Sequence, residues 1–569
     1  MKKRRLLFSF CSIFLVLGFL LIPPACCEVT TTTEGGRAVF GLLDLMGSPN
    51  PFNTAGADDT VVMSRIYEPL VILDEAGVVL PGIAESWTWS EADLTWTFTI
   101  RDAEWSDGQP VTADDVKYSL DKCWELDTAS GADAKPMLAA TDPVTVVDAS
   151  TVKIKLADPP IATFLSNMNG PYIVPKHIWE DVEDTLEYAN TNPVGSGPFL
   201  WEEYVEQQYV LMSANPNYWG GAPHIDELLF KVYGTSDALN LALIAGEVDM
   251  CAVDQYSAVP QLLLNQKIKI VLDSPSNYWS FIYPNHRFEP NNLPAFRRAV
   301  DLAIDKEQIV DFAVFGYGAI PTQVPMVPES MINPDTTWPG LDYETDAERI
   351  AAANDMLDAI PLMSDMPADP PDGWVRTYDG EPVSFTLNHQ STPDRVRTAE
   401  IIHNSLAEVG IEMNLEVMGT GAMVAMLFFG EDFENWEWAI FGHGASPGWD
   451  GIVQEYANPS YNVWYDAPAV GWGDDGEGGG TASALAAQAK IRAVQLETDP
   501  DDQLALAYEA QELFAAELPV LLGHQASLVF AYSTENFTNW APVGLFDGYG
   551  SSGWLATNPN LISITPVEE

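Results

Sequence analysis

The stretch that decides the fold reads WTFTIRDAEWSDGQPVTADDVKYSL and covers residues 96–120. Together with Leu94, its first residues alternate between large apolar side chains and threonines, a period of two that predicts a half-buried strand over 94–100. Residues 86–88 before it, with residues 91–93 as a turn, complete a predicted hairpin. The strand then runs into a turn and a helix start.

Local structural roles account for the acidic residues of this stretch. Asp107-Gly108 is a turn dipeptide in which glycine supplies the positive φ. Thr112 is placed to cap a helix, and Asp115 is placed three residues later to return the hydrogen bond as a capping box. Asp114 and Asp115 also fall in the first helical turn, where the helix dipole favours negative charge. We therefore interpret these carboxylates as structural, not as a catalytic or ligand site.

The composition describes a large, strongly acidic globular protein. A chain of 569 residues exceeds what one hydrophobic core usually supports, so two or three subdomains are expected. The 82 acidic and 26 basic residues give a net charge of −56, which repels phosphate backbones and excludes nucleic acid as a partner. Both a saline habitat and an ordinary acidic secreted protein account for this charge.

The N-terminus has the pattern of a targeting segment. Four basic residues precede an unbroken apolar run over 6–22, so residues 1–27 are predicted to be a signal peptide or membrane anchor. Cys26 or Cys27 is a candidate lipidated residue, although a proline stands where such signals normally carry leucine. Residues 28–37 then form a Thr/Gly-rich tether. The body of the protein is expected outside the cytoplasm.

No metal, cofactor or catalytic group is indicated. The seven histidines are scattered without HExxH spacing, and Cys123 and Cys251 are either paired or two buried thiols. Two stretches, 361–373 and 467–483, have the composition of surface insertions; the latter offers acidic groups to calcium, but in no known ligand spacing. Residues 444–448 match the GxSxG motif of hydrolases. Pro447 lacks the N–H that the oxyanion hole needs, so we do not expect an enzyme.

The second half of the chain alternates strands with helices. A strand over 384–387, a helix over 392–409 and a strand over 411–417 predict an α/β domain with parallel pairing. Helices are also expected over 295–303 and 306–314, the second capped by Asp305. In the first half, GSGP over 195–198 lacks the lysine and helix of a phosphate loop, so it is predicted to be a turn.

Several ordered segments together resemble the extracellular solute-binding proteins of ABC importers, family 5. They are YEPLVILDEAGVVLPGIAESW (67–87), the stretch 96–120, NPVGSGPF (192–199), NPNYWGGAPHIDELLFKVY (215–233), GEVD (246–249), RRAVDLAIDKEQIV (297–310), GYGAIPTQVP (316–325) and HNSLAEVGIEMNLE (403–416). The resemblance covers nearly all of residues 38–560.

This resemblance implies an α/β, periplasmic-binding-protein-like class II fold, with two lobes joined by a hinge that the chain crosses twice. We place the crossings near 274–282 and 523–529. The expected parts are lobe I, its extra subdomain, and lobe II. Lobe I is expected to comprise residues 38–58, 190–277 and 526–569. Its extra subdomain covers 59–189, and lobe II covers 278–525.

The implied function is the capture of a small solute, above all an oligopeptide or dipeptide, for a membrane permease and its ATPase. An oligosaccharide is the alternative, favoured by the 18 tryptophans. Nickel chelates, haem or a surface receptor without transport remain open. The protein is expected to act as a monomer without a cofactor, tethered to the membrane.

The resemblance also suggests where ligand binds. Tyr278 and Trp279 lie at the first crossing, and His389 and Arg395 lie between a predicted strand and helix, where Arg395 could receive a carboxylate. Peptide-binding relatives pair an acidic residue near Pro447 with the ligand's amine; here His443 stands there, and Asp450 is the possible substitute. The full set of expected ligand contacts is Tyr278, Trp279, His389, Arg395, Phe441, His443, Trp449, Asp450 and Trp464. Replacing Trp279 or Trp449 by alanine is expected to weaken binding without unfolding the protein.

Overall fold

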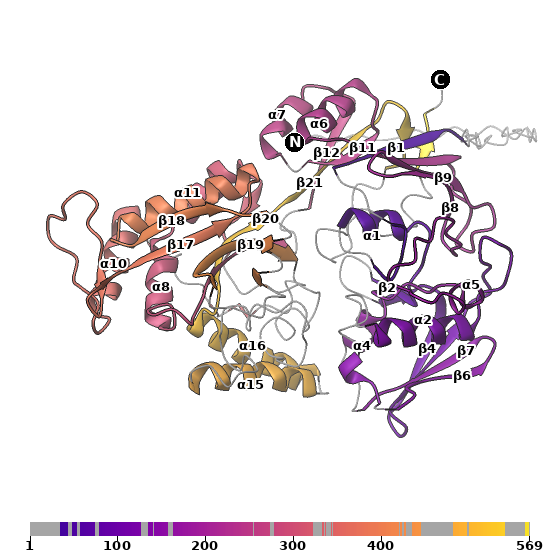
Figure 1. Cartoon of the computed structure of the whole chain (residues 1–569), viewed down its shortest axis with the longest axis horizontal. Helices are drawn as coiled ribbons and strands as arrows, with labels where there is room; N and C mark the ends of the chain where they lie inside the picture. The colour runs from indigo at the N-terminus through magenta and orange to yellow at the C-terminus, as the bar shows by residue number, and fades with distance from the viewer. Residues whose placement is uncertain are drawn as a thin grey trace, which may run out of the picture.

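The structure is a computed structural model. It describes residues 35–43, 48–53, 57–73, 79–126, 135–139, 141–157, 163–253, 255–273, 278–321, 333–334, 336, 343, 345–419, 422–423, 426–427, 435–444, 482–497, 500–540 and 564–567. In this part of the chain, two large mixed sheets lie side by side with helices on their faces, and a smaller sheet lies beside the first (Figure 1).

The first lobe is built on a seven-stranded sheet. Its order is β12 (Ile268–Asp273), β21 (Leu528–Ser533), β11 (Met250–Ala252), β1 (Arg37–Leu42), β10 (Glu227–Val232), β9 (Tyr209–Ala214) and β8 (Phe199–Val205). Strand β1 pairs in parallel with β10 and β11, and the other pairs are antiparallel. Helices α6 (Ser236–Ala245) and α7 (Val259–Leu262) bury a separate apolar cluster with β11, β12 and β21. Thr235 caps α6, and Gly246 ends it in the left-handed region.

The subdomain of the first lobe carries the stretch 96–120. Its four-stranded sheet has the order β4 (Ala84–Ser90), β5 (Thr95–Ile100), β7 (Thr151–Lys155) and β6 (Val144–Asp148), and α2 (Ala113–Glu125) packs on it. The predicted hairpin is confirmed, but β5 begins one residue late because Leu94 has φ 50° and belongs to the turn.

The predicted capping box of α2 is also present. The Thr112 backbone N–H donates to Asp115 Oδ2 at 2.8 Å, and the Thr112 hydroxyl donates to the same oxygen at 2.7 Å. Asp115 Oδ1 accepts from the Lys176 backbone N–H at 2.8 Å, which joins α2 to α5 (Lys176–Trp179). Asp107 accepts from the Gln109 backbone N–H within the turn and lies 2.8 Å from His177 Nε2. The structural interpretation of these carboxylates therefore holds.

The second lobe is built on a six-stranded sheet. Its order is β14 (Gly318–Ala319), β20 (Leu521–Ala526), β13 (Tyr278–Pro284), β19 (Trp438–Gly444), β17 (Ser384–His389) and β18 (Glu412–Val417). As predicted, β17 and β18 are parallel, with α11 (Pro393–Ala407) between them. The same lobe contains α8 (Pro294–Ala303), α9 (Lys306–Gln308), the π-helix η3 (Ile309–Ala313), α10 (Asp346–Asp358), α15 (Ala482–Leu496) and α16 (Pro500–Glu517).

The remaining short elements complete the described part of the chain. They are α1 (Ala57–Met63), β2 (Val71–Leu73), β3 (Val79–Pro81), η1 (Lys135–Met137), α4 (Thr163–Asn167), η2 (Tyr256–Ala258), β15 (Thr377–Tyr378), β16 (Glu381–Pro382), β22 (Phe537–Thr538) and β23 (Thr565–Pro566). The predicted insertion at 361–373 has neither helix nor strand. Cys123 and Cys251 are both buried, in separate apolar clusters of the first lobe.

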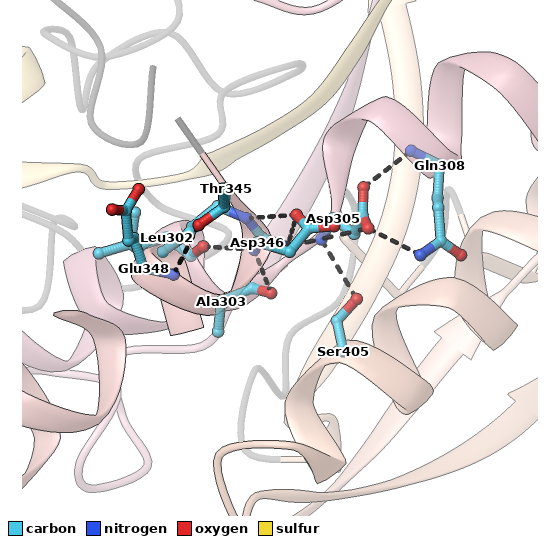
Figure 2. Close-up of polar contacts among 9 residues, drawn as sticks. Leu302, Ala303, Asp305, Gln308, Thr345, Asp346, Glu348 and Ser405 are labelled. Atoms are coloured by element: carbon cyan, nitrogen blue, oxygen red, sulfur yellow. Dashed lines mark hydrogen bonds and ion pairs between the residues drawn. The ribbon is translucent and has the colours of Figure 1, made fainter. Parts of the chain in front are cut away.

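Polar side chains join the helices of the second lobe (Figure 2). Asp305 caps α9, as predicted, by accepting from the Gln308 backbone N–H at 2.8 Å, and its own N–H donates to Ser405 Oγ on α11 at 3.2 Å. Arg349 on α10 donates at 2.6 Å to each of the carbonyls of Leu302 and Ala303, where α8 ends. This junction fixes α8, α9, α10 and α11 relative to one another.

The chain passes between the two large sheets twice. It leaves the first after β12 and enters the second at β13, and it returns at Ser527, where β20 runs into β21 (Figure 1). Both changes of sheet fall at or beside the segments expected for the hinge. The domain bounds themselves stay a prediction.

Candidate ligand-binding site

One edge of the six-stranded sheet gathers the strand ends where a ligand is expected. Strands β17 and β19 run in the same direction, and β13 begins where β19 ends, with Tyr278 opposite Gly444. Strand β20 ends at the same edge, because Gln525 lies opposite Trp279. Ligands of α/β sheets meet the carboxyl ends of strands. This edge also receives both chain crossings, so it is the candidate site.

A buried cationic group lies at this edge. Arg395, in the first turn of α11, is only 4% exposed, and its Nη1 donates to Ser280 Oγ on β13. Its Nε lies 3.5 Å from Asp394 Oδ2. The predicted placement of Arg395 at a helix start is confirmed, but the side chain is packed and not solvated. An anion at this site would meet both the guanidinium and the positive end of the helix dipole.

His524 is the group that sequence reasoning missed. It lies opposite Ser280 in the β13–β20 ladder, is 2% exposed, and its Nδ1 has no hydrogen-bond partner in the described structure. Burial, and then the positive charge of Arg395, lower its pKa to about 3, so the ring is neutral near pH 7. The sequence signal that could have identified it is a histidine in an apolar segment, within the predicted second crossing at 523–529.

The residues at the end of β17 are held by backbone groups. His389 is 2% exposed, and its Nδ1 lies 2.8 Å from the Gln390 carbonyl oxygen, to which it donates. Asn388 Nδ2 donates to the Trp438 carbonyl oxygen at 3.2 Å. The structure thus brings His389 and Arg395 to the same end of the sheet, with Ser280 and His524 beside them.

The aromatic residues predicted here pack inward. Trp279 is 2% exposed and Phe441 is 8% exposed, and both belong to the apolar core of the second lobe. Removing the Trp279 ring would leave a core cavity, a change that typically costs about 3–5 kcal/mol. Because the ring is part of the core, Trp279→Ala is expected to destabilise the second lobe, and its effect on ligand binding stays a prediction.

Several predicted residues cannot be placed. The backbones of Tyr278 and His443 lie in β13 and β19, respectively, but their side chains are outside the described part of the structure. The remaining ones lie outside the described residues, namely Trp449, Asp450, Trp464, the GxSxG segment after Gly444, the acidic stretch within 467–481, and Cys26 and Cys27. Among the residues that are described, no group of three metal-ligating side chains occurs. Nor does any helix there have the length and apolarity to span a bilayer.

The motifs that carry the family resemblance meet elsewhere, around Glu68 in the first lobe. Its carboxylate accepts from Ser196 Oγ at 3.0 Å, from the Tyr218 hydroxyl at 2.7 Å and from Trp219 Nε1 at 2.9 Å. The Arg101 guanidinium lies 3.4 Å from the centroid of the Trp219 ring. Burial raises the pKa of Glu68 to about 7, against the opposing effect of these donors and of Arg101. Three distant segments of the chain thus meet around the buried carboxyl of Glu68.

The GSGP turn is part of the same contact. A Cβ on Gly195 would lie 1.9 Å from the Ile66 carbonyl oxygen, and one on Gly197 would lie 2.4 Å from the Arg65 carbonyl oxygen. Glycine is needed here because the two backbones touch. The segment is therefore a packing turn, as predicted, and it is followed by strand β8 and not by a helix.

Two α/β lobes, joined where the chain crosses twice between their sheets, define the class of hinged two-lobe binding proteins. The model of the family described as "Bacterial extracellular solute-binding proteins, family 5 Middle" matches residues 78–469, and the chain belongs to this family. The resemblance and the class II fold predicted from the sequence are therefore confirmed.

Named relatives agree with this assignment. A putative ABC transporter peptide-binding protein of Brucella abortus is 27% identical over 388 residues, 67% of this chain and 68% of that protein. The oligopeptide-binding protein AppA of Bacillus subtilis is 26% identical over 455 residues, 75% of this chain and 79% of that protein. The structure of AppA in complex with a nonapeptide superposes with a TM-score of 0.74 at 21% identity, covering 94% of this chain and 100% of that one.

Proposed function

We propose that this chain captures an oligopeptide between its two lobes outside the cell and delivers it to the permease of an ABC importer. The observation that carries the proposal is the sheet edge at the hinge, where Arg395, Ser280 and His524 meet the start of α11. The names of the relatives favour a peptide among the solutes of the family. Closure of the lobes would enclose the ligand, and opening would release it.

Peptide chemistry fits the groups at this edge. A peptide carboxylate would be attracted by Arg395 and by the N-terminus of α11, and its backbone would lie along β19 beyond His443. Only 4% of Arg395 is exposed, so the carboxylate would have to approach the sheet edge closely. We keep Tyr278, His389, His443, Trp449, Asp450 and Trp464 as the other proposed contacts. Trp279 and Phe441 are left out because both rings belong to the core.

Oligosaccharide is the second candidate. His443 stands where peptide-binding relatives are expected to place an acid for the ligand's amine, and the chain contains 18 tryptophans. Tryptophan faces stack well on sugar rings.

Thermal-shift titration of the full chain distinguishes the two candidates. Di- to pentapeptides are compared with cello- and xylo-oligosaccharides of similar length. Stabilisation by peptides alone supports the proposal, and stabilisation by sugars alone overturns it. A ligand present at about 100 times its Kd adds about 2.7 kcal/mol to the free energy of unfolding, which such a titration detects.

A matched pair of arginine variants tests the anchor. Arg395→Met should weaken peptide binding at least about tenfold, because the charge-assisted contact to the carboxylate is lost. Arg397→Met is the control, since Arg397 is exposed two residues further along the same helix. Equal affinities in calorimetry for the two variants would remove Arg395 from the site.

We also propose that the protein is a monomer, tethered to the membrane through residues 1–27, and that it makes and breaks no bond in its ligand. A lipid on Cys26 or Cys27 would place the full chain in the detergent phase on partition. The double variant Cys26→Ser/Cys27→Ser would move to the aqueous phase unless the apolar segment 6–22 remains as an anchor.

A further inference from the structure

Two tyrosines stack across the boundary between the lobes. Tyr256 lies in η2 of the first lobe, directly before α7, and Tyr317 lies in the second lobe, directly before β14. Their ring centroids are 6.0 Å apart and the ring planes differ by only 12°. Tyr317 also packs against the apolar cluster of the first lobe formed by α6, α7 and the neighbouring strands.

The backbone of Tyr317 is fixed to the second crossing of the hinge. Strand β14 pairs with β20, with Gly318 opposite Ala526. One step further, the Ser527 backbone N–H donates to the Tyr317 carbonyl oxygen at 3.2 Å. Tyr317 therefore lies level with the residue at which the chain leaves the second sheet for the first.

We propose that the Tyr256–Tyr317 stack is a third connection across the hinge, which guides how the lobes turn relative to one another. Near-parallel rings can rotate about their common normal, or slide a little, and remain in contact. Tilting or separating the rings breaks the contact. The stack thus permits the lobes to rotate or slide in the plane of the rings and resists tilting or separation. It adds this restraint to that of the two covalent crossings.

The stack is strong enough to matter for a hinge. A stacked aromatic pair changes an equilibrium between two arrangements about two- to tenfold. Removing one ring should therefore raise the population of lobe orientations outside the wild-type range by about that factor. The inference rests on the hinged binding mechanism proposed above, but it concerns the ligand-free protein, so it can fail while peptide binding holds.

Interlobe distances in the ligand-free full chain test the inference. Spin labels on genetically encoded keto amino acids at the exposed positions 206 and 408 report on the first and second lobe, and native cysteines stay in place. Pulsed dipolar spectroscopy should show a broader distance distribution for Tyr317→Ala and for Tyr256→Ala. The double variant should be no broader than either single variant, because the same contact is lost in all three.

Two further variants serve as controls. Tyr317→Phe keeps the stacked ring and should keep the wild-type distribution. Tyr378→Ala removes a half-buried tyrosine of the second lobe that forms no ring stack with any other residue that the structure describes. Circular dichroism identifies any variant that fails to fold, and Tyr256→Leu then replaces it. Distributions that remain as narrow as wild type in every folded variant lacking one of the two rings would overturn the inference.

Discussion

Glu68 shows how one buried carboxyl can join segments that carry the family resemblance. Its carboxyl is 3% exposed and is held by hydroxyl and indole donors from two distant segments of the chain. A buried carboxyl with several donors fixes the segments that supply them, because each donor would be costly to leave unpaired. At the hinge, by contrast, His524 is buried and its Nδ1 has no hydrogen-bond partner among the described residues. The two groups are therefore expected to change the stability of the folded protein with pH in opposite directions.

Glu68 should make the protein less stable as pH rises. Its pKa in the folded chain is raised from 4.5 to about 7, so its contribution is complete below about pH 4.5 and is lost as pH rises through about 7. The difference corresponds to on the order of 3 kcal/mol. In urea unfolding, wild type should lose this much relative to Glu68→Gln over that interval. A constant difference between the two proteins would contradict the assignment.

His524 should remain neutral under mildly acidic conditions. Its pKa is lowered from 6.5 to about 3, so the stability that depends on the neutral ring is present above pH 6.5 and is lost as pH falls toward 3. NMR of the imidazole nitrogens should show no titration of His524 between about pH 8 and pH 5. The urea-denatured chain is the control, since its histidines titrate near 6.5. Titration of His524 near that value in the folded protein would mean that water reaches this end of the sheet.

At the scale of elements, charged side chains of one helix bind the backbone carbonyls at the end of another. Arg297 and Arg298 lie on α8, but they donate hydrogen bonds to backbone carbonyls at the end of α16, more than two hundred residues later. Arg297 donates to the carbonyls of Asn291, Glu517 and Leu518 at 2.7, 2.5 and 2.8 Å. The unsatisfied carbonyls of a helix end thus receive charged donors from another helix.

Loss of Arg297 should be among the most damaging single changes. Arg297 is 1% exposed, and Arg297→Met leaves several buried carbonyls without donors, so we expect a loss of about 3–5 kcal/mol in the free energy of unfolding. Lys490→Met is the control, because the Lys490–Glu509 ion pair at 2.7 Å lies at the surface, with side chains 33% and 58% exposed, and should contribute less than about 1 kcal/mol. Similar urea midpoints for the two variants would contradict this account.

The cap of α2 should contribute a smaller, local amount. Thr112→Ala removes the hydroxyl that donates to Asp115, and helix caps of this kind contribute about 1 kcal/mol. Thr88→Ala, on an exposed position of β4, should cost much less. Ligand affinity should stay unchanged in both variants. If calorimetry showed weaker peptide binding for Thr112→Ala, the subdomain of the first lobe would influence the ligand-binding site, contrary to this prediction.

At the scale of the whole molecule, the charge is distributed unevenly. Among the described cationic side chains, Arg297, Lys306 and Arg376 are buried and bind backbone carbonyls or a carboxylate instead of lying among the surface acids. The net charge of −56 is therefore left to a surface with few compensating cations. Repulsion within such a surface opposes the compact state.

Salt should therefore stabilise the folded protein. Raising NaCl from about 0.1 M to about 1 M shortens the Debye length from about 10 Å to about 3 Å, which weakens repulsion between the acidic side chains. We expect Tm to rise over this range, and KCl at the same ionic strength to have the same effect. A Tm that is unchanged or falls in both salts would show that surface repulsion does not limit stability.

The sequence by itself determined the local structure and the family. Period-two alternation placed β5, the Thr112–Asp115 spacing placed the start of α2, and ordered motifs identified a two-lobe binding protein, because all of these signals depend on residues close in sequence. Only the tertiary structure decided which distant groups meet. It assigned the Trp279 ring to the core, brought His524 beside Ser280 and Arg395, and stacked Tyr256 on Tyr317. Such contacts depend on strand order and on how the helices pack, which no short stretch of sequence encodes.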